Sequence, residues 1–305
     1  MSLIVPKIQP DELLGGYRGR IAAFNHLCTP QEVSSALGKH FPEAARWRNQ
    51  SLTFIHAAAA ANGLTPELIM DRYSCYPIYA RVDKNVSRDL DSERVLSGLW
   101  SIALQVPGLR VRACSACVEE DLTTRSFSYW RRSHQVPGRF LCPEHGRPLW
   151  RTDPSALLGS GPDDAARRDR VFKDLVTARL AKNTFIAKAV SLLDMLLLVS
   201  KPLDRAAASM ILRRRLSIGG TGPASEATVR SISKKLIEAF DPAWLRFAVP
   251  EVGKSGSGLS RIVAGALNPN AGPSCVSISI LACMAFPTAA QALRALSQPG
   301  VSSGD

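Results

Sequence analysis

The sequence lacks a long uninterrupted apolar run. Its most apolar stretch, residues 185–200, contains Lys188 and Asp194 and is shorter than the roughly 20 residues that span a bilayer. The first residues, Met1 to Lys7, lack the apolar core of a secretory signal peptide. We therefore expect no membrane-spanning segment, no export and a cytoplasmic protein, and we expect residues 185–200 to form a buried helix.

Motifs of several enzyme classes are missing as well. Gly253-Lys254-Ser255 resembles the end of a phosphate-binding loop, but Ala248 stands where the first glycine of that motif belongs. The sequence has no Gly-x-Ser-x-Gly elbow and no His-Glu-x-x-His helix. A dispersed acidic transposase triad would need an α/β scaffold, which the sequence pattern does not indicate. We therefore expect a protein that is not an enzyme and has no catalytic residues.

The charge balance is strongly basic. Lysine and arginine number 38 against 26 aspartates and glutamates, which gives a formal net charge of +12. Such a surplus favours polyanionic partners such as DNA, with an anionic membrane surface or mere solubility as the alternatives. The seven cysteines form an odd number, which favours a reducing compartment. At 305 residues and 46% hydrophobic content, the chain can form two or three compact units.

Helical signals dominate most of the chain. Thr29-Pro30-Gln31-Glu32 fits a capping box with proline in the first turn, and Gly38 is placed to end that helix. Around residues 106–152 the periodicity disappears, and only residues 127–130 suggest a short strand. Helices are predicted in the second half at 164–182, 184–199, 203–216, 225–240, 242–248, 276–286 and 288–297.

These patterns predict a mainly α fold with three domains. They are a helical N-terminal domain over 1–105, a small zinc-knuckle domain with little β structure over 106–152, and a helical C-terminal domain over 153–297. Residues 298–305 are expected to form a disordered tail.

A metal-binding pattern lies in the middle of the chain. Cys114-x-x-Cys117 is followed, after a long gap, by Cys142-Pro143-Glu144-His145-Gly146. Zinc prefers four thiolate or imidazole ligands at tetrahedral angles, and two ligands separated by two residues fit one tight turn. Pro143 fixes the backbone of the second turn and Gly146 permits a left-handed exit. We predict that Cys114, Cys117, Cys142 and His145 bind one structural Zn²⁺ ion.

Other interpretations of these cysteines and histidines are weaker. A redox Cys-x-x-Cys would need a βαβ context, and a disulfide would need an oxidising compartment. A catalytic zinc leaves one position open for water, whereas three cysteines and a histidine fill all four. His134 is predicted to be a hydrogen-bonding neighbour of the metal ligands. The remaining cysteines are predicted to be inert core thiols: Cys28, Cys75, Cys275 and Cys283.

A family resemblance rests on these same segments. Residues 112–121 (RACSACVEED), 129–138 (YWRRSHQVPG) and 142–149 (CPEHGRPL) resemble the TniQ family of TnsD-like transposon target-selection proteins, and residues 10–14 (PDELL) resemble its opening segment. The similarity covers roughly residues 8–150. The sequence departs from the family pattern at Ser115, where proline is common, and at Leu13 and Gly15, where serines are usual.

The resemblance implies a non-enzymatic adaptor in bacterial DNA transposition. Family members bind DNA or a guide-RNA complex at the target, and they recruit a TnsC-like AAA+ ATPase regulator that in turn recruits the transposase. A zinc-containing DNA-binding transcriptional regulator is the alternative, and a metal-dependent hydrolase or deaminase is a third class. Homodimer formation stays open.

Two segments are candidate helix-turn-helix units. In residues 51–73, Ala59 suits a close helix contact and Gly63 a turn. Its second helix carries Glu67 and Asp71 against one cation, Arg72, so we expect it to meet protein rather than the major groove. Two ordinary helices joined by a glycine are the alternative.

The second candidate covers residues 203–240. Val229, Ile232 and Leu236 form its inward stripe, and several cations lie on the other face or at the end of the first helix. Cations at a helix end also suit the helix dipole, and arginines beside zinc also offset thiolate charge. The predicted DNA-binding residues are Arg131, Arg132, Arg213, Arg214, Arg230, Lys234 and Lys235.

Overall fold

The computed structural model describes residues 3–80, 104, 110–159, 161–164, 169–199, 203–220, 222–254, 258–270 and 274–297. The predicted tail at 298–305 and the end of the predicted N-terminal domain lie outside these residues. The described chain is mainly α with one small sheet, as the sequence predicts. It divides into two compact units: Met1–Pro77 with Asp89–Lys173 (unit 1), and Ile78–Arg88 with Asp174–Asp305 (unit 2). The three predicted domain boundaries stay a prediction.

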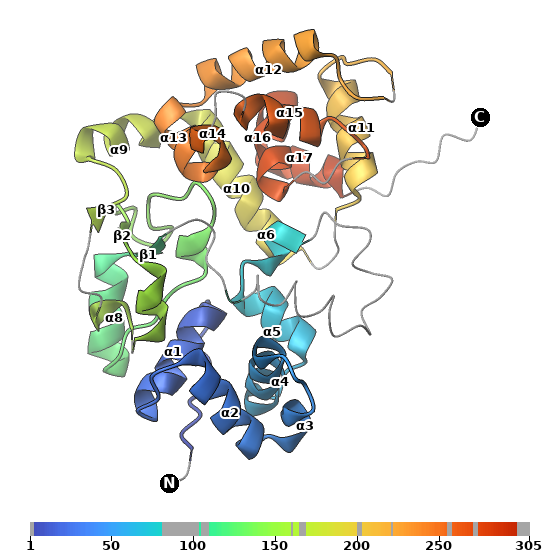
Figure 1. Ribbon diagram of the computed structural model, residues 1–305. Coiled ribbons are helices and arrows are strands. Elements are labelled where there is room, and N and C mark those ends of the chain that lie inside the picture. Colours follow the sequence, from blue (N-terminus) through green and yellow to red (C-terminus); the bar gives the residue numbers. More distant parts are fainter. Residues whose placement is uncertain are drawn as a thin grey trace. The chain divides into compact units, whose positions relative to one another are not determined.

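Unit 1 begins with a group of short helices, drawn in blue and cyan in Figure 1. They are α1 (Leu14–Phe24), α2 (Pro30–His40), α3 (Pro42–Ala45), α4 (Gln50–Asn62), α5 (Pro66–Tyr73) and the first residues of α6 (Tyr76–Ala80). Their apolar faces share one core that includes Tyr17, Leu37, Phe54 and Ile69. The predicted capping box is present, since Thr29 accepts from the Glu32 amide and Glu32 accepts from the Thr29 amide.

The second part of unit 1 contains the sheet. Its strands are β1 (Val111–Ala113), β2 (Trp150–Thr152) and β3 (Asp169–Arg170), antiparallel in the order β1-β2-β3. The helix α8 (Ser115–Arg125) follows β1 directly, and short 3₁₀ turns lie at η2 (Ser133–Gln135), η3 (Pro154–Leu158) and η4 (Pro162–Asp164). Trp130 and Trp150 pack edge to face in the core beneath the sheet.

The N-terminal segment joins these two parts of unit 1. The Leu13 amide donates to the Trp130 carbonyl at 2.6 Å, and the Arg132 amide donates to the Asp11 carbonyl at 2.7 Å. Glu12 is fully buried and accepts both Nε (2.9 Å) and Nη2 (2.6 Å) of the buried Arg20. Such a pair is costly to break, because either partner alone would be an uncompensated buried charge.

Unit 2 is entirely helical in its described residues (Figure 1). Its helices after α6 are α9 (Asp174–Ala181), α10 (Thr184–Leu198), α11 (Arg205–Arg215), α12 (Glu226–Ala239), α13 (Pro242–Ala248), α14 (Glu251–Lys254), α15 (Gly258–Ala266), α16 (Cys275–Ala285) and α17 (Ala289–Leu296). Residues Cys275 to Cys283 of α16 are all buried, as expected for a helix that is apolar on every side. Lys188 of α10 donates to the Cys283 and Phe286 carbonyls at the end of α16.

Side-chain caps explain where the helices of unit 2 begin. Asn183, Asp204, Ser225, Asp241, Ser274 and Thr288 each accept a backbone amide at the start of α10, α11, α12, α13, α16 and α17. Among the described residues no single helix is long and apolar enough to cross a membrane; α16 and α17 meet that test only as a pair, across a 118° bend.

Four local expectations are wrong. Residues 127–130 form no strand, and Asp169–Arg170 belongs to β3 rather than to a helix over 164–182. Gly38 does not end α2, which continues to His40. Cys28 is exposed in a loop, whereas Cys75, Cys275 and Cys283 are buried as predicted. At Asp169–Arg170, tertiary pairing with β2 overrides the local sequence signal.

Candidate metal centre

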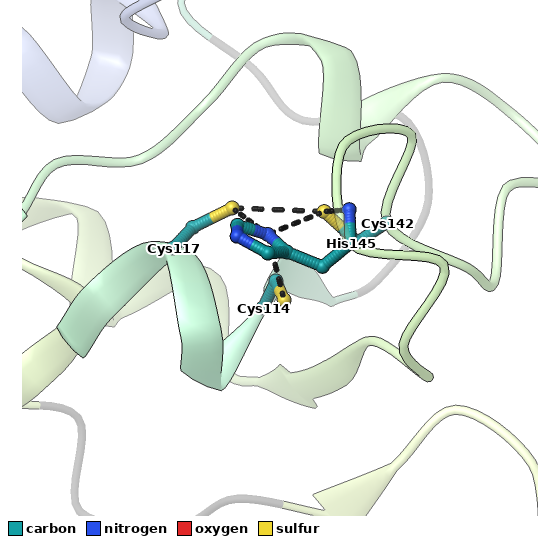
Figure 2. A group of neighbouring side chains, drawn as sticks. All are labelled: Cys114, Cys117, Cys142 and His145. Atoms are coloured by element: carbon teal, nitrogen blue, oxygen red, sulfur yellow. Dashed lines mark hydrogen bonds between the residues drawn. The ribbon is translucent and has the colours of Figure 1, made fainter. Parts of the chain in front are cut away.

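The four predicted ligands converge from two turns of unit 1 (Figure 2). Cys114 is the N-cap residue of α8 in an extended conformation, and Cys117 lies in the first turn of that helix. Cys142 and His145 lie on a tight turn between Leu141 and Pro148, which form an antiparallel bridge. The ligand atoms of all four residues lie within 4.8 Å of one another. This group could hold a metal ion.

The second turn has the backbone that its sequence predicts. The Gly146 amide donates to the Cys142 carbonyl at 2.9 Å, and the Cys142 amide donates to the Arg147 carbonyl at 2.8 Å. Gly146 has a φ of 63°, in the left-handed region that glycine adopts without strain. The His145 amide points at the Cys142 sulfur at 3.4 Å, so the turn also supplies a backbone donor to a thiolate.

The distances between ligand atoms fit a tetrahedral ion. Zn–S bonds of about 2.3 Å at tetrahedral angles separate two sulfurs by about 3.8 Å. Here Cys117 Sγ and Cys142 Sγ are 3.6 Å apart. His145 Nδ1 lies 3.3 Å from Cys117 Sγ, 3.5 Å from Cys142 Sγ and 3.9 Å from Cys114 Sγ. One small cation placed among the four atoms would reach all of them.

The close thiols also shift one another's pKa. Contacts with Cys117 and Cys142 lower the pKa of Cys114, and the contact with Cys114 raises the pKa of Cys117. The opposite directions arise because three sulfurs this close cannot all carry a negative charge unless a cation compensates them. The residues present therefore fit a thiophilic divalent ion such as Zn²⁺.

His134 lies next to the thiols, as predicted. Its Nε2 is 3.5 Å from Cys142 Sγ and 3.7 Å from Cys117 Sγ, so an Nε2–H tautomer donates to both sulfurs. Burial lowers the pKa of His134 to about 3, which keeps the ring neutral. Its Nδ1 is buried without a hydrogen-bond partner in the described part of the chain. His134 thus supports the ligands from the interior side.

Four arginines near the cluster are buried: Arg112, Arg131, Arg132 and Arg139. Arg131 pairs with Asp121 at 3.1 Å and donates to the Tyr129 hydroxyl. Arg132 donates to the Asp71 carbonyl at 2.6 Å. The buried Arg112 donates to the Arg139 carbonyl. Arg131 and Arg132 are thus buried and hydrogen-bonded within the protein, and their role as DNA contacts stays a prediction.

Exposed charged residues of both signs flank the ligands, since Arg125 and Arg147 are exposed along with several carboxylates. Glu119 and Glu120 of α8 and Glu144 of the second turn are all exposed. His145 Nε2 lies 3.8 Å from Glu120.

The remaining predicted DNA contacts lie in unit 2. Arg214 on α11 and Arg230, Lys234 and Lys235 on α12 are exposed. Arg213 is only 3% exposed, because its guanidinium donates to three backbone carbonyls. Whether Arg213 takes part in DNA binding stays a prediction.

Sequence reasoning missed the contacts between the N-terminal segment and the metal-binding part of unit 1, residues 110–152, which we call the metal module. The Asp11 carboxylate accepts from the Ser133 amide at 3.1 Å and from the Ser133 hydroxyl at 2.5 Å. Burial raises the pKa of Asp11 and of Glu12. The available signal was a pair of adjacent acidic residues, Asp11 and Glu12, ahead of a helix. The partner of Asp11 lies more than a hundred residues away, and the partner of Glu12 lies on the helix that follows.

Comparison with known protein families gives a match. Residues 3–149 match the sequence model of the TniQ family, close to the predicted extent of 8–150. This segment contains the four candidate ligands and ends before β2, so residues 150–305 lie outside the match. No curated protein significantly matches the chain.

Proposed function

With a TniQ domain over residues 3–149 as the premise, we propose that the chain is a target-selection adaptor in DNA transposition. The TniQ domain indicates involvement in the selection of transposition targets. In this proposal the chain binds DNA, or a guide-RNA complex on DNA, and recruits an AAA+ ATPase regulator of the transposase. The observation that carries the proposal is the match itself, which includes the metal cluster.

The metal in this proposal is one structural Zn²⁺ ion. Three thiolates and one imidazole fill a tetrahedral shell and leave no position for a reacting water. Bound there, zinc would link the start of α8 to the turn at Cys142–His145 and neutralise two of the three thiolate charges. The chain's own residues supply the rest, since His134 donates to two sulfurs from the interior side. This arrangement supports an adaptor rather than an enzyme.

Helix α12 is the proposed DNA-facing element. Val229, Ile232 and Leu236 are buried on one side of it, while Arg230 and Lys234 are exposed on the other. Arg230 and Lys234 are one helical turn apart, so their charges lie next to each other. The net charge of +12 adds a favourable long-range field for DNA.

Helix α5 is the proposed contact with a protein partner. It follows α4 after a turn in which Gly63 has a φ of 66°, and Ala59 and Ile69 are buried where the two helices meet. Its exposed residues include Glu67 and Leu68, the latter 36% exposed. An exposed leucine next to a carboxylate suits a protein surface better than a phosphate backbone.

The test is capture of the AAA+ ATPase encoded by the same transposon. Full-length zinc-loaded chain should retain the ATPase, and target DNA should increase the retained amount. Leu68→Asp should reduce capture about tenfold or more, as expected for a central apolar contact. Leu175→Asp on α9 is the matched control, because Leu175 is 88% exposed and lies in unit 2.

Absence of capture with and without DNA would contradict the adaptor role. If the chain instead alters transcription from a promoter without any ATPase, the transcriptional-regulator alternative would be favoured. Equal capture by wild type and Leu68→Asp would leave recruitment in place but remove α5 from it.

A further inference from the structure

A polar pocket of about 620 Å³ lies in unit 2 between the end of α11 and the first half of α12. The connecting loop, whose described residues are Leu216–Gly220 and Gly222–Ser225, forms one wall. The lining is rich in groups that can donate hydrogen bonds or carry positive charge: Arg213, Ser217, Ser225, Thr228, Ser231 and Lys235. No carboxylate is among the described residues that line the pocket.

Arg213 gives this pocket a fixed positive charge. Its Nη1 donates to the Gly222 carbonyl at 2.7 Å and to the Leu267 carbonyl at 3.0 Å, and its Nη2 donates to the Gly219 carbonyl at 2.5 Å. All three acceptors are neutral, and Nε is buried without a partner in the described part of the chain. The guanidinium is thus held rigidly with no carboxylate to compensate it, a state that an incoming anion would relieve.

The start of α12 adds further donors. The Ser225 hydroxyl accepts from the Thr228 amide at 3.2 Å, which satisfies one of the first backbone donors of this 14-residue helix. The amides of Glu226 and Ala227 precede the first intrahelical bond, made by Val229, and the positive end of the helix dipole lies here.

Side chains on α12 extend the same surface. Thr228, Ser231 and Lys235 follow the spacing of one helix face, and all three line the pocket. Long helical side chains lean toward the N-terminus, so the Lys235 ammonium is carried toward Ser231. Glu226, the acidic residue of the first turn, is exposed and does not line the pocket.

We propose that this pocket binds a phosphate group, supplied by the DNA backbone. Lys235 and Ser231 contact the phosphate oxygens, the first-turn amides of α12 face the phosphate, and Arg213 holds the loop and adds its charge from behind. The inference rests on the proposed function for the source of the phosphate. In this proposal the predicted DNA-binding residue Arg213 is a buried residue that positions the loop.

The experiment uses the full-length chain with one substitution pair. Ser231 is exposed, so Ser231→Glu and Ser231→Gln should both fold, which circular dichroism can check. The two variants have nearly the same size but differ by one negative charge within the pocket. Duplex DNA should bind the Glu variant at least about tenfold more weakly than the Gln variant, and the Glu variant should show the flatter salt dependence.

A second arm identifies the source of the phosphate. Amide NMR shifts of Ala227 and Thr228 are followed while inorganic phosphate or a short duplex is added. We expect both ligands to shift the same two amides in wild type, and neither to do so in Ser231→Glu. Shifts with inorganic phosphate but none with the duplex would overturn the DNA assignment, and no shift with either ligand would overturn the pocket.

Failure of this inference is separable from failure of the proposed function. If the ATPase is captured while Ser231→Glu and Ser231→Gln bind DNA equally, the pocket proposal is wrong and the adaptor role stands. If the duplex binds in the pocket while the ATPase is never captured, the adaptor role is wrong and the pocket stands.

Discussion

Cys142 contributes to the metal cluster through both its side chain and its backbone. Its sulfur lies 3.6 Å from Cys117 Sγ and accepts from the His145 amide, and its carbonyl closes the turn at Gly146. Cys142→Ser keeps the turn but replaces a soft thiolate by a hydroxyl, which zinc binds poorly. We expect zinc content to fall from about one ion per chain to near zero, measured by metal analysis of the purified protein.

The stability cost of that substitution should be large. Structural zinc contributes about 10–16 kcal/mol in zinc-finger peptides, whereas a whole domain is stable by only about 5–15 kcal/mol. The metal module should therefore lose its fold. Cys28→Ser is the control, because Cys28 is an exposed thiol outside the cluster. Full zinc retention by Cys142→Ser would contradict the assignment of Cys142 as a ligand.

At the scale of single residues, ligands are easier to predict from sequence than arginine roles. The spacing of Cys114 and Cys117, and of Cys142 and His145, indicates two tight turns, and each turn is a local feature of the sequence. Arg131 has the same chemistry as the exposed Arg230, and only its pairing with Asp121, ten residues away, shows that it faces inward. Arg132 depends on a carbonyl 61 residues away. Such distant partners leave no local signal.

In unit 1, the backbones of α1 and η3 approach each other closely at Gly19. A Cβ atom on Gly19 would lie 1.8 Å from the Leu157 carbonyl oxygen and 2.8 Å from that of Gly159. The backbone of η3 has to move to make room, so we expect Gly19→Ala to destabilise unit 1 by about 3 kcal/mol or more. The measurement is the shift of the urea unfolding midpoint, followed by the fluorescence of Trp130 and Trp150.

Gly63→Ala provides the matched control for Gly19→Ala. It lies in the same unit and makes the same chemical change, but a Cβ there meets no atom within 4 Å. Only its left-handed backbone, with a φ of 66°, resists the substitution, at a cost of about 1–2 kcal/mol. If Gly19→Ala costs no more than Gly63→Ala, α1 and η3 do not pack as closely as described.

At the scale of elements, helices were predictable and strands were not. The capping box at Thr29–Glu32 and the cap at Asn183 are complete within a few residues, so the local sequence contains the whole signal. Strand β3 has two residues, and its pairing with Trp150–Arg151 connects segments nearly twenty residues apart. The predicted helix over 164–182 is therefore wrong at Asp169–Arg170, because pairing with β2 in the sheet determines the conformation of these two residues.

The two units are stabilised in different ways. In unit 1 the described residues form two separate apolar cores, and the second of these lies under the sheet and the metal module. In unit 2 the apolar helix α16 is buried along most of its length and is contacted by α10, α11, α15 and α17. Removal of the metal is therefore expected to lower the stability of unit 1 much more than that of unit 2.

Removal of zinc tests this difference across the whole chain. A chelator should accelerate amide hydrogen exchange through α8, the Cys142–His145 turn and β1–β2, because loss of the metal would remove the link between the start of α8 and that turn. Exchange at Leu13 should rise as well, since its amide donates to Trp130. Amides of α16 should stay protected. Added Zn²⁺, but not Mg²⁺, should restore the slow exchange seen before the chelator was added. Equal acceleration in α16 would mean that the metal supports both units, contrary to their separate cores.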